Sequence, residues 1–81
     1  MRLVGEVPHP HLKITLFSWN NRYLVKFEQG YLEQTYKIDQ FDVSGDEALK
    51  QILDPVFLDS VSARFQSMDQ DWGEAIRRAD T

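Results

Sequence analysis

The sequence contains no cysteine, so it offers no disulfide bridge, no thiolate nucleophile and no Cys-ligated zinc or iron–sulfur site. Long apolar runs are also missing. The longest, such as Val56-Phe57-Leu58, have three residues, whereas a membrane-spanning helix needs roughly 20. The first residues lack the apolar stretch of a secretory signal peptide. We therefore expect a chain that resides in the cytoplasm, does not enter a membrane and binds no cofactor.

Glycine and histidine are scarce, which limits the catalytic chemistry that the chain can support. The four glycines form no phosphate-binding loop, and no serine lies in a G-x-S-x-G setting. His9 and His11 could share a metal ion, but two ligands are too few for a closed zinc site. The segment Asp69–Gly73 has half of a calcium-loop pattern, but Met68 occupies the position that requires the first carboxylate. We predict no catalytic role and no metal site.

Positive charge is limited and unevenly placed. The net charge is −4; residues 1–38 carry five basic and three acidic side chains, and residues 39–81 carry four and ten. An acidic chain disfavours non-specific nucleic-acid binding, because neutralisation of phosphates by Lys and Arg dominates that affinity. A locally basic surface remains possible in the N-terminal half.

Eighty-one residues provide for one hydrophobic core, so we expect a single compact domain over residues 1–81. Residues 12–19 alternate between apolar and other side chains, which predicts a half-buried strand. Asn20-Asn21 predicts a two-residue hairpin turn. The resulting register places Phe17 opposite Leu24, apolar against apolar, and Lys13 opposite Glu28. Because a slip of one residue would reverse both faces, this agreement supports the hairpin.

A second turn is predicted around Gln29-Gly30, with a loop of either two or four residues. Both lengths place Leu32, Gln34, Tyr36 and Ile38 on the core side of a third strand. Gln34 is then a polar residue in the core, so it must find hydrogen-bond partners or lie near an edge.

After Asp39 the pattern changes to a helical period. Ser44 and Glu47 fit a capping box at the start of a short helix. Asp54 fits the N-cap and Pro55 the first position of a second helix. Gly73 weakens that helix by about 1 kcal/mol relative to Ala, so we expect a break near Asp69 to Gly73 and a short third helical piece. The second helix has the clearest amphipathic pattern, formed by Phe57, Leu58, Val61, Phe65, Met68 and Trp72.

These elements predict an α+β fold: a three-stranded antiparallel β-meander followed by two or three α-helices packed on one sheet face. Leu3-Val4 could add a fourth, N-terminal edge strand. The opposite sheet face would have an apolar centre and charged margins. Its aromatic residues and Arg are typical of the centres of protein interfaces. We predict a small protein-interaction domain that associates with a second copy of itself, as a homodimer, or with another protein, through Phe17, Trp19, Arg22, Leu24, Tyr31 and Lys37.

Two alternatives apply to the same face. Residues 1–10 or the segment around Trp72 could fold over it, which would make it a second small core. It could also bind single-stranded nucleic acid by stacking bases on its aromatic side chains, although the acidic net charge and the absence of an RRM-like signature oppose this.

Overall fold

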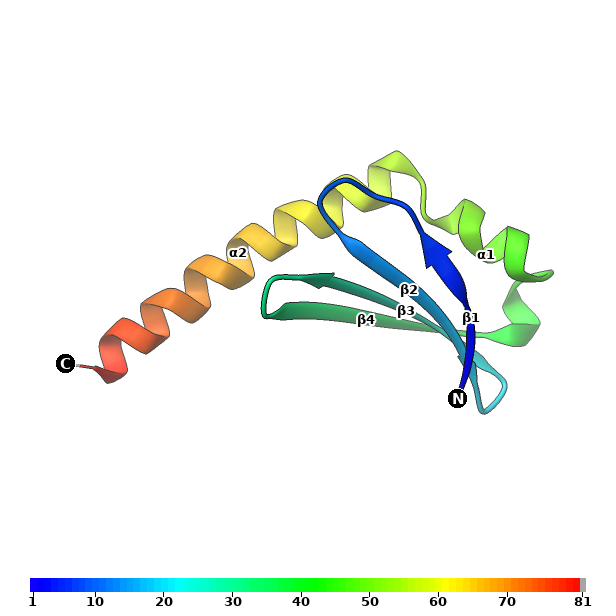
Figure 1. Ribbon diagram of the computed structural model, residues 1–81, viewed down its shortest axis with the longest axis horizontal. Helices are drawn as coiled ribbons and strands as arrows, with labels where there is room; N and C mark the ends of the chain where they lie inside the picture. The colour runs from blue at the N-terminus through cyan, green and yellow to red at the C-terminus, as the bar shows by residue number, and fades with distance from the viewer. Residues whose placement is uncertain (81) are drawn as a thin grey trace.

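The computed structural model describes residues 1–80 and shows an antiparallel α+β fold. Four strands form one sheet in the order β1-β2-β3-β4, and two helices follow (Figure 1). Leu49 and Leu53 from the helical region share one core with Ile14 and Phe27 of the sheet, so the helices cover a single sheet face. The elements are β1 (Arg2–Val7), β2 (Lys13–Trp19), β3 (Arg22–Gln29), β4 (Leu32–Asp39), a 3₁₀ turn η1 (Gln40–Asp42), α1 (Asp46–Ile52) and α2 (Pro55–Ala79).

The β2–β3 hairpin has the predicted register. Asn20 and Asn21 form its turn with φ angles of 55° and 63°, the left-handed backbone that a type I′ turn requires. Phe17 lies opposite Leu24, and every other predicted pair from Trp19–Arg22 to Lys13–Glu28 is present.

The β3–β4 turn uses the shorter of the two predicted loops. Gln29 pairs directly with Leu32, which leaves Gly30 and Tyr31 as the two central residues. Gly30 has a φ of 60°, and glycine is the residue that adopts this backbone without strain. This turn places Leu32, Gln34, Tyr36 and Ile38 on the helix side of β4, as predicted.

The fourth strand is present and contains an irregularity. β1 pairs with β2 at the sheet edge; Leu3 lies opposite Phe17, but Gly5 lies opposite Leu16. Val4 is therefore an extra residue, as in a β-bulge, and it packs against the core. This shift leaves Leu3 on the sheet face away from the helices.

Gln34, the polar residue on the core side of β4, has hydrogen-bond partners on both ends of its amide. Its Nε2 donates to the Val61 carbonyl oxygen of α2 at 3.1 Å, and its Oε1 accepts from the Tyr36 hydroxyl at 2.6 Å. The Tyr36 oxygen accepts in turn from Arg64 at 3.0 Å. The tyrosine ring also packs edge-on against Phe57 at 5.3 Å, so polar and aromatic contacts join β4 to α2 at the same place.

The start of α1 differs from the predicted capping box. Gly45, not Ser44, is the N-cap, and no side chain caps the helix. The adjacent Asp46 instead accepts a hydrogen bond from the Tyr23 hydroxyl at 2.9 Å, which fixes the first helical turn against β3. Glu47 forms an ion pair with Lys50 rather than reaching back to Ser44. The hydrogen bond to Asp46, together with burial, raises the pKa of Tyr23 above its ordinary value.

The predicted break in the second helix is wrong. α2 begins as predicted, with the Asp54 carboxylate accepting from the Phe57 amide and Pro55 in the first turn, but it runs through Gly73 to Ala79. The two expected helical pieces are therefore one helix of 25 residues, and the fold has two α-helices. A penalty of about 1 kcal/mol at one glycine is too small to end a helix that continues regularly on both sides.

The length of α2 makes the molecule elongated. Its first half lies over the sheet, and its second half projects past the β3–β4 turn (Figure 1). The principal extents are 50 × 26 × 18 Å, and the radius of gyration is 14.8 Å. A compact domain of this length would have a radius of gyration of about 12 Å. The projecting half of α2 accounts for the difference.

Candidate interaction surface

The side of the sheet that faces away from α1 and α2 is the candidate interaction surface, and we name it the open sheet face. Leu16 and Val25 form one cross-strand pair in the core, so the next pair, Phe17 and Leu24, must point to the other side. Leu24 is only 8% exposed yet does not belong to the helix-side core. The side chains next to it on the same face therefore shield it from water.

An apolar row crosses three strands at the centre of the open sheet face. Leu3 of β1 pairs with Phe17 of β2, which pairs with Leu24 of β3. Leu3 is 60% exposed and Phe17 is half-buried. Lys37 of β4 completes the row.

A second row lies next to it, at the end of the sheet that carries the Asn20-Asn21 turn. Trp19, Arg22 and Asp39 pair across β2, β3 and β4. Trp19 is 49% exposed, which is high for a large aromatic side chain that forms part of a sheet. The indole thus extends the apolar row toward this end of the open sheet face.

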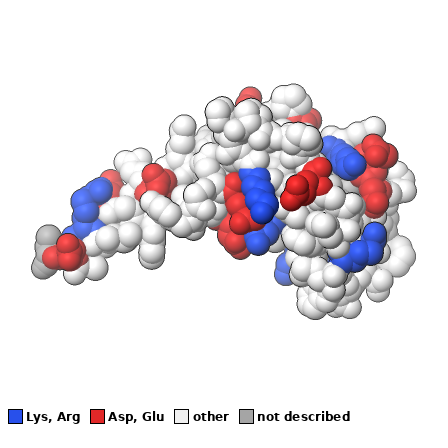
Figure 2. All heavy atoms as spheres, in the orientation of Figure 1, with Lys and Arg blue, Asp and Glu red and all other residues white. Residues whose placement is uncertain are grey.

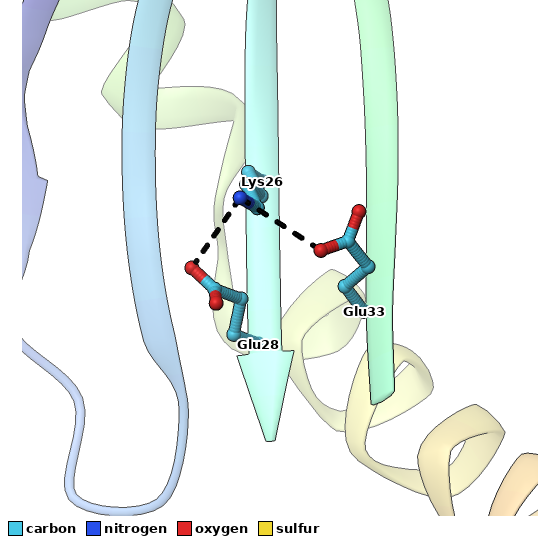
Figure 3. A network of polar contacts seen from close by, with 3 residues as sticks. All are labelled: Lys26, Glu28 and Glu33. Atoms are coloured by element: carbon cyan, nitrogen blue, oxygen red, sulfur yellow. Dashed lines mark ion pairs between the residues drawn. The ribbon is translucent and has the colours of Figure 1, made fainter. Parts of the chain in front are cut away.

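The opposite end of the open sheet face contains an ion-pair network (Figure 3). Glu28 and Glu33 are directly paired across β3 and β4, an arrangement that places two like charges together. The Lys26 ammonium lies between them, 3.8 Å from a Glu28 oxygen and 3.7 Å from a Glu33 oxygen. This lysine therefore offsets the repulsion that the register imposes.

The open sheet face has no net charge, but its basic and acidic side chains are unequally divided between its two ends. It carries four basic and four acidic side chains. At the Trp19 end, Arg22 and Lys37 outnumber Asp39. At the other end three glutamates outnumber two lysines. The acidic members are Glu6, Glu28, Glu33 and Asp39, and the basic members are Lys13, Arg22, Lys26 and Lys37.

Five of the six residues predicted for this surface lie in its two neighbouring rows, and the sixth, Tyr31, lies apart from them. Tyr31 occupies the β3–β4 turn, at the far end of the strands from Trp19, where it lines a hollow together with Phe65 and Asp69 of α2. It is 82% exposed and lies near the projecting helix rather than in the apolar row. Sequence reasoning missed Leu3, because the irregularity at Val4 that turns Leu3 outward has no signature in the alternation of β1.

No segment of residues 1–80 covers the open sheet face. The N-terminal residues, which could have folded across it, extend the sheet at its β2 edge as β1. Trp72 lies on α2, the helix that packs on the opposite side. The alternative of a second, enclosed core on this face is therefore not what the structure shows.

The histidine segment forms a tight loop between β1 and β2. His9 Nδ1 accepts hydrogen bonds from the amides of His11 and Leu12, each at 3.1 Å, so this nitrogen holds the loop. Asp69 and Asp71 lie on the continuous helix α2. Among residues 1–80, no group of three His, Cys, Asp or Glu side chains is arranged to hold a metal ion.

None of the helices within residues 1–80 combines the length and the apolar character needed to cross a membrane. Comparison of the chain with protein-family models, with curated proteins and with solved structures gave no match. Function is therefore inferred from the surfaces of the protein itself.

Proposed function

We propose that the chain is a small cytoplasmic protein-interaction domain that forms a twofold dimer through the open sheet face. The observation that carries this proposal is the apolar row Leu3, Phe17 and Leu24, flanked by Trp19, on the side of the sheet that neither helix covers. A buried apolar centre with Trp and Arg beside it and charged residues at its rim is the usual composition of a protein interface.

A second copy suits this face because its charge distribution is complementary to itself. The Trp19 end carries an excess of positive charge, and the end with Glu28 and Glu33 carries an excess of negative charge. Two faces packed with their strands running in opposite directions place each positive end against a negative end. Two sheets pack in this way about 10 Å apart, with their side chains interdigitated.

Association would also stabilise a small fold. A single core from a chain of this size supplies only about 3–5 kcal/mol. Burial of Leu3, Phe17 and Trp19 between two copies would contribute about 25 cal/mol of stabilising free energy for each Å² of apolar surface removed from water.

Nucleic-acid binding on the same face has weaker support. The four basic side chains are matched by four acidic ones, and Lys26 is held between Glu28 and Glu33. Phosphate binding would have to break these ion pairs and would gain no net attraction from the face as a whole.

Analytical ultracentrifugation tests the proposal across about 10 to 500 µM protein, a range that covers interfaces of modest size. Trp19→Ala should weaken self-association at least about tenfold, because Trp is among the residue types whose truncation costs the most binding energy at protein interfaces. Val56→Ala is the matched control, since Val56 is 76% exposed on the first turn of α2, away from the open sheet face. An unchanged association constant for folded Trp19→Ala would reject the open sheet face as the interface.

A further inference from the structure

The projecting half of α2 carries an apolar stripe that continues the stripe buried against the sheet. Val61 and Phe65 are fully buried. From Val61 onward, residues on this side of the helix recur at alternating spacings of four and three, the heptad pattern of a helix that packs along another helix. We name residues 66–79 the α2 overhang. The stripe comprises Val61, Phe65, Met68, Trp72, Ala75 and Ala79, with Ile76 beside it.

The stripe leaves the core where the sheet ends. Met68 still packs against the core, and a hollow lined by Leu32, Met68, Asp71 and Trp72 marks this point. Beyond it, Trp72 and Ile76 are 53% and 51% exposed. The protomer therefore presents an indole and an aliphatic side chain to water on the same side of one helix.

A helix of this kind needs a packing partner. The α2 overhang has 14 residues, about 21 Å of helix. It continues a helix that is already nucleated by its buried half, but propagation in water is only weakly favourable without packing. Gly73 lowers its stability further. Most helical stability in proteins comes from the packing of an apolar face, which the sheet no longer supplies here.

The charges of the α2 overhang indicate what that partner is. Asp69 and Asp71 lie in its first half, Glu74 lies just past its midpoint, and Arg77 and Arg78 lie in its last turn. Figure 2 shows the basic side chains of the overhang gathered near its tip. An identical helix placed antiparallel brings the acidic part of each copy beside the basic turn of the other, whereas a parallel arrangement places like charges together.

We propose that the α2 overhang pairs antiparallel with the α2 overhang of a second copy of this chain. In an antiparallel seam, Trp72 of one helix packs against the small side chain of Ala75 of the other, and Met68 packs against Ala79. In this register Asp71 faces Arg78 of the second copy on both sides of the twofold axis. In the seam a large side chain thus packs against a small one, and beside the seam an acidic side chain lies opposite a basic one.

This contact is separate from the open sheet face and does not depend on it. The open sheet face lies on the helix-free side of the sheet, and the α2 overhang extends past the β3–β4 turn (Figure 1). One protomer can use both surfaces at once. Two different twofold contacts on one protomer link copies into a closed tetramer or a longer chain, whereas either contact alone gives a dimer.

The oligomeric states of Trp19→Ala, Trp72→Ala and the double variant, measured by sedimentation, distinguish the two contacts. With both present, the wild type forms tetramers or longer assemblies, each single variant forms dimers and the double variant is monomeric. If only the helix contact exists, the wild type is a dimer and Trp72→Ala alone makes it monomeric. The helix proposal is overturned if Trp72→Ala leaves the wild-type state unchanged, whatever Trp19→Ala does.

A charge exchange tests the antiparallel register. In the Trp19→Ala background, Asp71→Arg or Arg78→Asp alone should raise the dissociation constant about three- to tenfold, because each places like charges in contact across the seam. The combined Asp71→Arg and Arg78→Asp variant restores opposite charges and should return toward the starting value. Failure of the combined variant to recover would contradict the antiparallel pairing, and circular dichroism of each variant confirms that it is folded.

Discussion

The side-chain amide of Gln34 donates a hydrogen bond to the main-chain carbonyl oxygen of Val61 at 3.1 Å, across the buried boundary between β4 and α2. Gln34 is only 8% exposed, yet both ends of its amide have a partner. A buried amide without partners would be costly, so this bond restricts where along α2 the sheet can lie. It therefore helps to set how far the helix projects beyond the sheet.

Replacement of Gln34 by alanine should lower the free energy of unfolding by about 1–3 kcal/mol, because it removes one buried and one partly buried hydrogen bond and leaves a cavity. Urea denaturation followed by circular dichroism measures the change. Gln66→Ala, at an exposed position of α2, is the control and should shift the value by less than about 0.5 kcal/mol. Equal effects of the two substitutions would show that the bond to Val61 contributes nothing.

Lys26→Met should lower the stability of the protomer by about 0.5–1 kcal/mol at low salt, because Glu28 and Glu33 then repel each other without the intervening ammonium. The loss should shrink in 1 M salt, where the Debye length is about 3 Å. In a Glu33→Gln background the same substitution should cost less, since one of the two like charges is gone. A loss that is independent of both salt and Glu33 would rule out the electrostatic explanation.

The hydrogen bond from Tyr23 to Asp46 predicts a pH dependence at the alkaline end. Since it raises the pKa of Tyr23 in the folded state, its stabilising contribution is complete below the ordinary tyrosine pKa of about 10 and is lost as the pH rises through the higher folded value. Tyr23→Phe should therefore be less stable than the wild type at pH 8, and the gap should narrow above pH about 10. Unfolding curves of the two proteins across this range provide the measurement, and a gap that widens with pH would have the wrong sign.

Gly73→Ala should stabilise α2 by up to about 1 kcal/mol. A Cβ at this position would meet only the Arg77 Nη1 atom at 3.6 Å, an ordinary van der Waals distance. Greater helical ellipticity and a higher melting temperature are the expected results, with the apolar stripe unchanged. A loss of ellipticity would contradict a continuous helix at Gly73 and would support the break that the sequence predicted there.

The parts of the fold that the sequence predicts are those specified by local chemistry. Asn20-Asn21 defines a two-residue turn, and that turn fixes the register of β2 against β3. Asp54 and Pro55 define the start of α2 in the same way. In each case two or three adjacent residues are enough to predict the turn or the start of the helix.

The parts that the sequence does not predict depend on contacts between distant residues. The Tyr23–Asp46 bond fixes the start of α1, so the capping pattern around Ser44 is overridden. The shift at Val4 decides that Leu3 joins the open sheet face. Tyr31 lies in the β3–β4 turn itself, where the alternation of the strands does not determine the direction of a side chain. The apolar row at the centre of the open sheet face was thus predictable only for Phe17 and Leu24.

The chain has two tryptophans, and each lies in one of the two proposed contacts, Trp19 on the open sheet face and Trp72 on the α2 overhang. Their indole N–H signals in a ¹H–¹⁵N spectrum therefore report the two surfaces separately as the protein is diluted. We predict that the Trp19 signal shifts or broadens with rising concentration, together with the methyl signals of Leu3 and Leu24, while those of the buried Leu16 do not. A Trp19 signal of constant position and width across the whole range would contradict self-association through the open sheet face.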